Sequence, residues 1–160
     1  MASGELTLRP ATAADLEALN AVVERAVLSW DLPERVKRLS LPVYRYQHAD
    51  LSAYQILVAE TAFGEIVGVA AWEALVPLDA PPAVLLHGLY VDPGRHRGGV
   101  GTRLLEAVLD AARAAGQEGV LVRAQRDAEG FFAARGFQPV SDSEAPPRRW
   151  WRGIGPRSRH

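Results

Sequence analysis

The segment from Leu89 to Leu105 holds the residues whose types and spacing point most directly to chemistry. Three glycines, Gly98, Gly99 and Gly101, follow an apolar strand pattern and lead directly into a helical pattern. Glycine lets the backbone turn sharply and leaves amide N–H groups unobstructed by a Cβ atom, while a helix start adds unpaired N–H groups and the positive end of its dipole. These features predict a phosphate or pyrophosphate site. The alternative is a glycine-rich turn without a ligand.

Two well-known phosphate motifs do not fit this segment. A P-loop needs a lysine directly before its Ser or Thr, but Gly101 precedes Thr102. A dinucleotide fingerprint needs a third small residue, and that position holds Leu104. The segment therefore predicts an anion site of another type.

The same glycines resemble the acetyl-CoA-binding segment of the GNAT (Gcn5-related N-acetyltransferase) superfamily. The pattern of that family is Gln/Arg-x-x-Gly-x-Gly/Ala, and Gly99, Val100 and Gly101 match its glycine end. His96 occupies the leading Gln/Arg position, which is a departure from the pattern. The departure is mild because the pyrophosphate contacts of the family are mostly made by backbone amides.

A second segment, residues 125–137, resembles the Asn-x-x-Ala-x-x-Phe-Tyr-x-x-x-Gly-Phe stretch of the same family. Gln125 stands for the Asn, and Phe132 stands where the Tyr usually lies. The two motifs occur in the family's order, separated by one helical and one strand pattern, and the resemblance covers about residues 5–152.

The resemblance implies a mixed α/β (α+β) fold in a single domain spanning residues 1–160. A central, mixed, mostly antiparallel sheet with splayed central strands would be flanked by helices. The core would span about residues 5–152, and residues 153–160 would form a loose tail.

The resemblance also implies acetyl-CoA as co-substrate and no metal. The strand before the loop would contact the pantetheine arm, the loop amides would contact the pyrophosphate, and Phe132 would pack near the thioester. The cofactor-binding residues expected on this basis are Leu89, Tyr90, Val91, His96, Arg97, Gly98, Gly99, Val100, Gly101, Thr102, Gln125 and Phe132.

His87 is the first candidate for a catalytic base. Acetylation of an amine requires a neutral nucleophile, so a group with a pKa near neutrality is best suited to remove the proton. His87 lies two residues before Leu89, and some members of the family place a base at this strand position. The alternative is a packed core histidine. Glu73 is the second candidate for the base and would act through a water molecule. Alternatively, Glu73 is a solvated carboxylate at the end of a strand and has no catalytic role.

The CoA thiolate that leaves also needs a proton. The family often supplies it from the tyrosine that is Phe132 here, and phenylalanine cannot donate one. Three alternatives remain: water or the substrate's own proton suffices, Tyr90 substitutes, or catalysis is weak or absent. Alternatively, Tyr90 is a buried packing residue and not an acid.

Hydrophobic periodicity predicts the elements that must position these residues. Thr12 and Asp15 predict a capped helix start, and the continuous apolar run at 83–91 predicts a strand buried on both faces. Strands are expected at 5–9, 55–60, 66–75, 83–91, 119–124, 137–140 and 149–152, and helices at 13–28, 101–115 and 128–135, with a less regular helical stretch at 34–52 interrupted at Pro42.

Composition narrows the class of protein further. The 160 residues are 48% hydrophobic and 23% charged, as in a folded domain. Lys and Arg number 18 against 19 Asp and Glu, which argues against nucleic acid or a membrane as partner. No cysteine is present, and no signal peptide or transmembrane run is recognisable, so a cytoplasmic location is expected.

These observations lead to one function hypothesis and one alternative. The chain would be an N-acyltransferase, in which a small-molecule or peptide amine attacks the thioester of acetyl-CoA directly. The alternative is an acyl-CoA-binding sensor or regulatory module with weak or no catalysis. The acceptor, the acyl-chain preference and the oligomeric state stay open, with a homodimer as one alternative.

Overall fold

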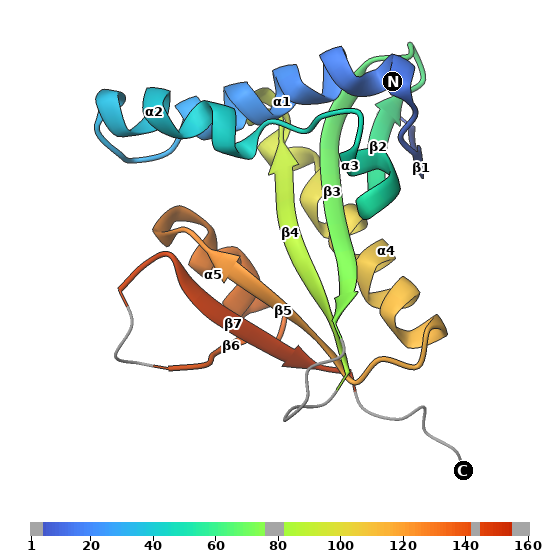
Figure 1. The fold of residues 1–160 in the computed structure, drawn as a ribbon, viewed down its shortest axis with the longest axis vertical. Coiled ribbons are helices and arrows are strands. Elements are labelled where there is room, and N and C mark those ends of the chain that lie inside the picture. Colours follow the sequence, from blue (N-terminus) through green and yellow to red (C-terminus); the bar gives the residue numbers. More distant parts are fainter. Residues whose placement is uncertain (1–4, 76–81, 142–144, 155–160) are drawn as a thin grey trace. The chain divides into compact units, whose positions relative to one another are not determined.

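The structure, a computed structural model, describes residues 5–75, 82–141 and 145–154. In Figure 1 the chain runs from β1 through α1, α2 and α3 to β2, β3 and β4, and then through α4, β5 and α5 to β6 and β7. The strands are β1 Leu6–Pro10, β2 Gln55–Thr61, β3 Ile66–Leu75, β4 Ala83–Val91, β5 Gly119–Ala124, β6 Gln138–Pro139 and β7 Arg148–Gly153. The helices are α1 Leu16–Leu28, α2 Glu34–Tyr44, α3 Asp50–Ala53, α4 Val100–Ala114 and α5 Arg126–Ala134, with 3₁₀ turns η1 Ala13–Asp15 and η2 Pro93–Gly98.

The seven strands form one mixed sheet in the order β1-β2-β3-β4-β5-β7-β6. The pairs β1–β2, β5–β7 and β6–β7 are antiparallel, whereas β4 and β5 are parallel. The parallel ladder runs from Ala83–Gly119 to Leu86–Val122, although β4 continues to Val91. The mixed, mostly antiparallel sheet and its accompanying helices confirm the expected fold class.

Backbone contacts divide the chain into two compact units. The first comprises the described parts of residues 1–71 and 88–106, and the second those of 72–87 and 107–160. Strands β3 and β4 and helix α4 each contribute residues to both units, which are described separately below.

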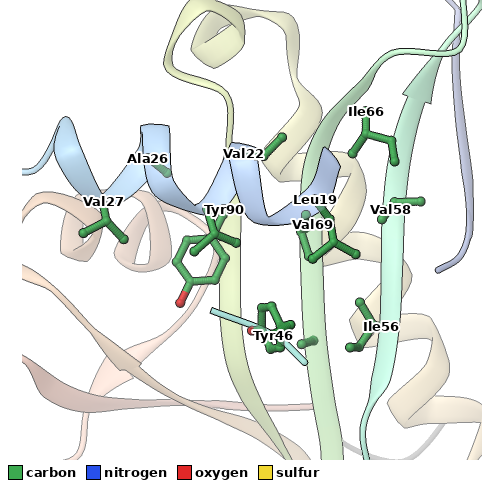
Figure 2. Close-up of a cluster of buried hydrophobic side chains, with 12 residues drawn as sticks. Leu19, Val22, Ala26, Val27, Tyr46, Ile56, Val58, Ile66, Val69 and Tyr90 are labelled. Carbon is green, nitrogen blue, oxygen red and sulfur yellow. The ribbon is translucent and has the colours of Figure 1, made fainter. Parts of the chain in front are cut away.

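In the first unit, the apolar face of α1 packs on β2, β3 and the end of β4. Leu19, Val22 and Val27 of α1 belong to one buried cluster with Val58 of β2 and Tyr90 of β4 (Figure 2). On β3, Gly68 instead faces α4, because a Cβ added there would lie 2.7 Å from Val100 and 2.8 Å from Leu104. Residues of β3 therefore pack against both α1 and α4.

In the second unit, β5 lies between β4 and β7, and α5 packs against β5. Val120, Val122 and Ala124 form the buried side of β5, and Trp150 is their buried neighbour on β7. Leu121 and Arg123 alternate with them and are half-buried and exposed, respectively. The sheet of this unit therefore has one packed face and one accessible face.

Two expectations about the elements were wrong. Pro42 does not interrupt a helix, because it lies inside α2, whose last residue is Tyr44. A proline so close to a helix end removes only one of the last helical hydrogen bonds. Strand β4 is not buried on both faces either: Val84, Leu86, Gly88 and Tyr90 are buried, but Leu85, Leu89 and Val91 are half-buried and His87 is exposed.

The end of the chain departs from the expected boundary. Gly153 belongs to β7, and the N–H of Ile154 donates to the carbonyl of Glu118 at 2.9 Å. The rest of the expected tail, residues 155–160, lies outside the described residues. None of the described helices is long and apolar enough to cross a membrane.

Candidate functional site

The glycine-rich loop of the first unit is anchored through Asp92, directly after β4. The N–H of Asp92 donates to the carbonyl of Val67 at 2.9 Å. Its carboxylate accepts from the N–H of Gly94 at 3.1 Å and from Arg25 of α1 at 2.8 Å. Partial burial opposes ionisation of this carboxyl, but these two donors hold its pKa below the ordinary value. Asp92 thus has the turn role that an Asp before Pro commonly has.

The loop itself places a row of backbone amides at the start of α4. Gly99 ends η2 with φ at +76°, a left-handed conformation that favours glycine, and α4 begins at Val100. The first α-helical bond of this segment runs from the N–H of Arg103 to the carbonyl of Gly99 at 3.0 Å. Amides of a first helical turn have no acceptor within their own helix.

The space over the loop backbone is open. Within the described part of the chain, a Cβ added at Gly98 or Gly99 would meet no atom within 4 Å. Gly101 and Thr102 follow in the first turn of α4. Open space, a left-handed turn and a helix start together form the geometry expected for an anion site.

Two arginines near this loop, Arg95 and Arg103, contact other groups of the protein. Arg95 lies 3.2 Å from the carboxylate of Glu65, and Arg103 donates to the carbonyl of Leu6 at 3.3 Å. The side chains of His96 and Arg97 lie outside the described part of the chain, although their backbone belongs to η2. Backbone amides, rather than arginine side chains, are therefore the donors that the described loop offers.

Tyr90 of β4 lies in the core of the first unit. It is 6% exposed, and its ring centroid is 6.5 Å from those of Tyr44 and Tyr46. Burial raises the pKa of Tyr90 well above its ordinary value, and the Tyr46 hydroxyl adds to the effect. A phenol in this position stays protonated, so the geometry favours its packing role over a role as acid.

The tyrosine pair explains why residue 88 is glycine. A Cβ at Gly88 would overlap the Tyr90 ring and lie 2.7 Å from the Tyr46 hydroxyl. Both Tyr side chains therefore pack directly against the backbone of β4. Tyr46 is held in turn by Asn20 of α1, whose amide donates to the Tyr46 carbonyl and accepts from its N–H, both at 2.8 Å. Sequence reasoning missed Asn20, and a polar residue on the apolar face of a helix was the available signal.

His87 and Glu73, the two candidate bases, form one pair in the second unit. His87 Nε2 lies 2.7 Å from Glu73 Oε2, across the neighbouring strands β4 and β3. Both side chains are accessible, since 27% of His87 and 35% of Glu73 is exposed. The histidine is thus not a packed core residue. An ionised carboxylate can only accept, so in this contact Nε2 of His87 is the donor.

Gln125 and Phe132 lie at the start and in the body of α5. Gln125 is the N-cap residue of this helix and is half-buried. Phe132 is 3% exposed and packs edge-to-face against Phe131 and Phe137, with ring centroids 5.2 and 5.1 Å apart. No hydroxyl exists at this position to protonate a thiolate.

A cluster on α5 and β7 was not predicted. Glu129 accepts from Arg148 Nε at 2.5 Å and from the indole of Trp150 at 3.0 Å. Although burial opposes ionisation, these two donors lower the pKa of Glu129. The cluster ties α5 to β7 and so fixes the helix that carries Phe132. Within the described residues, no group of three or more His, Asp or Glu side chains could hold a metal ion.

Comparison with known proteins gives the class of the chain. Residues 24–137 match the model of the acetyltransferase (GNAT) family. This match covers more than half of the sequence, and the chain therefore belongs to the GNAT family.

Two solved structures share the fold over nearly their whole length. The PaiA N-acetyltransferase of Thermoplasma acidophilum, in complex with coenzyme A, superposes with a TM-score of 0.79 at 15% identity, over 93% of this chain and 99% of that chain. A GCN5-related N-acetyltransferase from Rhodopseudomonas palustris has a TM-score of 0.75 at 25% identity, over 96% and 98% of the two chains.

A curated relative is similar over a shorter stretch. The L-methionine sulfoximine/L-methionine sulfone acetyltransferase of Pseudomonas paraeruginosa is 36% identical over 63 residues. The stretch makes up 39% of this chain and 37% of that enzyme.

Proposed function

We propose that the protein transfers the acetyl group of acetyl-CoA to the amine of a small molecule. The observation that carries this proposal is the turn into α4, where left-handed Gly99 precedes the helix and no described atom lies within 4 Å of a Cβ added at Gly98 or Gly99, in a chain of the GNAT family. In such a loop the pyrophosphate of acetyl-CoA accepts hydrogen bonds from the amides of Gly98, Gly99, Val100, Gly101 and Thr102.

The end of β4 is the proposed contact for the pantetheine arm. The ladder with β5 ends at Leu86, so the backbone of Leu89, Tyr90 and Val91 lies beyond the last described β4–β5 pair. Extended backbone of this kind can pair with the amides of pantetheine as it would with a strand. His96, Arg97, Gln125 and Phe132 complete the proposed set of cofactor residues by their places in the family motifs.

His87 is the proposed base, with Glu73 as its partner. Glu73 accepts a hydrogen bond from Nε2–H and stabilises the imidazolium that forms when the ring takes a proton from the amine. The amine nitrogen attacks the thioester carbonyl, the new C–N bond forms, and the C–S bond breaks. A backbone amide near Leu89 would stabilise the oxyanion. Because Phe132 has no acidic proton and Tyr90 is buried, the thiolate takes a proton from water or, by way of the His87 imidazolium, the proton that the amine gave up.

The acceptor class is inferred from the chemistry of one relative. L-methionine sulfoximine and L-methionine sulfone, the substrates in that enzyme's name, are small molecules with an amine. A small-molecule amine is therefore the proposed acceptor here.

The test is amine-dependent release of CoA thiol by the purified protein, measured over a panel of small amines. His87→Ala should lower kcat by about 10²- to 10⁴-fold, the usual contribution of a general base. Glu73→Gln, which keeps an acceptor oxygen but loses the charge, should lower kcat by about tenfold. Asp110→Asn, on the exposed side of α4, is the matched carboxylate control and should leave the rate unchanged. Full activity of His87→Ala would overturn the assignment of the base.

One observation favours a second candidate function, an acyl-CoA sensor. Phe132 is buried among Phe131 and Phe137, where the family's thiolate acid usually lies. A sensor would bind acetyl-CoA and release no thiol above background with any amine, whereas the proposed enzyme releases thiol in proportion to the amine.

A further inference from the structure

Apolar side chains form a row across the accessible face of the sheet in the second unit. Leu85 of β4 pairs with Leu121 of β5, and Leu121 pairs in turn with Trp151 of β7. Directly opposed residues of neighbouring strands point to the same face of a sheet, so the three side chains lie next to one another. All three are half-buried rather than closed off in the core.

Helix α5 covers the other face of these strands. Trp150 of β7 donates its indole N–H to Glu129 of α5 at 3.0 Å. Successive residues of a strand point to opposite faces, so Trp151 points away from α5. The Trp151 ring lies over Gly119 of β5, because a Cβ added at Gly119 would overlap it. The apolar side chains therefore lie on the face opposite the helix.

The row begins beside the candidate base and its partner. Glu73 of β3 and His87 of β4 are 2.7 Å apart, and the two strands are antiparallel (Figure 1). Two residues onward in β3 and two residues back in β4 therefore lead to neighbouring positions on the same face, Leu75 and Leu85. Leu75 is also half-buried and extends the row to β3. We refer to Leu75, Leu85, Leu121 and Trp151 as the apolar row.

An apolar row on an accessible face departs from the usual pattern of a sheet. A face that meets water normally carries polar side chains, because alternation along the strand directs the apolar ones to the core. Strand β5 buries Val120 and Val122 on its packed face, but it also places Leu121 on the accessible face. Apolar surface that continues over several exposed side chains is typical of a binding site.

The occupant of this row must leave the base pair accessible. A second copy of the chain, or another macromolecule, would also cover Glu73 and His87, which lie two residues from the row on the same strands. It would thereby block the approach of an amine to the base. A small molecule can contact the base and the row at once, because positions two residues apart on a strand are only about 6.6–6.8 Å apart.

We propose that the apolar row binds the carbon chain of the acceptor, so that the acceptor is an amine with an apolar alkyl or aryl group. This inference rests on the proposed acetyl transfer and narrows its acceptor from small amines in general to apolar ones. With the amine nitrogen at His87, the carbon chain runs along β4 to Leu85 and onto Leu121. Each methylene that the row removes from water should raise kcat/KM about fourfold.

The test compares two acceptors that differ only at the end of the chain. n-Hexylamine and 5-aminopentan-1-ol have the same length and amines of similar basicity, but the second ends in a hydroxyl group in place of a methyl group. With acetyl-CoA, the release of CoA thiol should have a kcat/KM about tenfold higher for hexylamine, because a hydroxyl group on apolar surface loses hydrogen bonds to water. Equal values, or a preference for the alcohol, would overturn the inference.

Substitutions in the row connect this preference to the proposed site. Leu121→Thr, which keeps a good strand former but adds a hydroxyl group, should bring the ratio of the two kcat/KM values close to one. Leu121→Ile should keep the ratio. Phe63→Ser, which removes a 97% exposed apolar side chain from the β2–β3 turn, is the matched control and should also keep it. If Leu121→Thr does not fold, Leu85→Thr gives the same comparison. A ratio that the threonine variants leave intact, or that Phe63→Ser lowers equally, would contradict the role of the row.

Binding separates a failure of this inference from a failure of the proposed activity. With CoA present, millimolar hexylamine should raise the melting temperature of the wild type more than 5-aminopentan-1-ol does, and Leu121→Thr should abolish the difference. Absence of thiol release with this binding preserved would reject the transfer activity alone. Equal effects of the two amines on the wild type would reject the apolar row as an acceptor site, whether or not thiol is released.

The oligomeric state tests the competing occupant, a second copy of the chain. Sedimentation velocity at several protein concentrations should give the same mass for the wild type and for Leu121→Thr. A wild-type dimer that Leu121→Thr dissociates would assign the row to the contact between two copies and would overturn the inference.

Discussion

Gly99 is the residue at which the conformation of the loop can be tested most simply. Its φ of +76° disfavours any side chain, whereas Gly98 has equally open space and no such φ. Gly99→Ala should therefore lower the free energy of unfolding by about 1 kcal/mol or more, the cost of a left-handed conformation for a residue with a Cβ. Gly98→Ala is the matched control and should stay near the wild-type value in urea unfolding. Equal effects of the two substitutions would contradict the described turn.

A second prediction for a single residue concerns Gly88. A methyl group there overlaps the Tyr90 ring and approaches the Tyr46 hydroxyl, and both rings are held by the α1 core. Gly88→Ala should destabilise the protein by about 1–3 kcal/mol, as overpacking does. Gly130 lies in α5, and no atom of the described residues is within 4 Å of a Cβ added there, so Gly130→Ala should instead stabilise by up to about 1 kcal/mol. Chemical denaturation followed by circular dichroism distinguishes the two.

The glycines of the loop, Gly98, Gly99 and Gly101, could be predicted from the sequence, because a bend between a strand and a helix restricts the residue types that fit. The His87–Glu73 pair was not, although both residues were singled out. Glu73 and His87 are 14 positions apart, and only the register of β3 against β4 brings their side chains to 2.7 Å. Hydrophobic periodicity gives strands but not the register between them, so two separate candidates became one pair only in the structure.

At the scale of an element, the start of α1 depends on Asp15. Its carboxylate accepts from the Thr12 N–H at 2.8 Å and pairs with Arg9 of β1 at 2.8 Å. The hydrogen bond from Arg9 is the main cause that lowers the pKa of Asp15 to about 2, from an ordinary 3.8. The stabilisation from this ionised carboxylate is therefore complete above pH 4 and is lost as the pH falls through the folded-state pKa.

Asp15→Asn should lower the free energy of unfolding by about 2 kcal/mol at pH 7, as a pKa shift of this size implies. The difference between variant and wild type should shrink as the pH falls from about 4 to about 2. Urea unfolding at several pH values measures it, and Asp110→Asn at an exposed ion pair should change stability little. A difference that does not vary with pH would show that Asp15 acts through packing rather than charge.

The helix start was predictable from Thr12 and Asp15, whereas the partner Arg9 was not, because it comes from another element. The strands at 66–75, 83–91 and 119–124 agree with the structure because each is bounded by strong turn residues. The burial of β4 was misjudged because leucine occupies half-buried positions 85 and 89 as readily as the buried position 86. An apolar run alone does not separate these two environments.

At the scale of the whole molecule, membership of the GNAT family and the described loop make acetyl-CoA the expected ligand. A ligand that binds only the folded chain raises stability with its free concentration, by about 2.7 kcal/mol at a hundredfold excess over Kd. Acetyl-CoA should therefore raise the melting temperature progressively, and ATP, which lacks the pantetheine arm, should do so far less. A melting temperature that is indifferent to acetyl-CoA would contradict the assignment of the ligand.

The family and the cofactor loop could be inferred from the sequence because they depend on local motifs in a fixed order. The acceptor could not, because even the proposed base pair is assembled from β3 and β4, where Glu73 and His87 are 14 positions apart along the chain. Specificity of this kind depends on strand register, and a single sequence does not contain that information in readable form.

Isothermal titration of the protein with acetyl-CoA tests the central claim most directly. We predict saturable binding of one acetyl-CoA per chain, weakened strongly in Gly99→Val, where a branched side chain disturbs the left-handed turn and covers the loop amides. Absence of binding, or binding that Gly99→Val leaves intact, would mean that the loop is only a turn and that acetyl transfer is not the function of this fold.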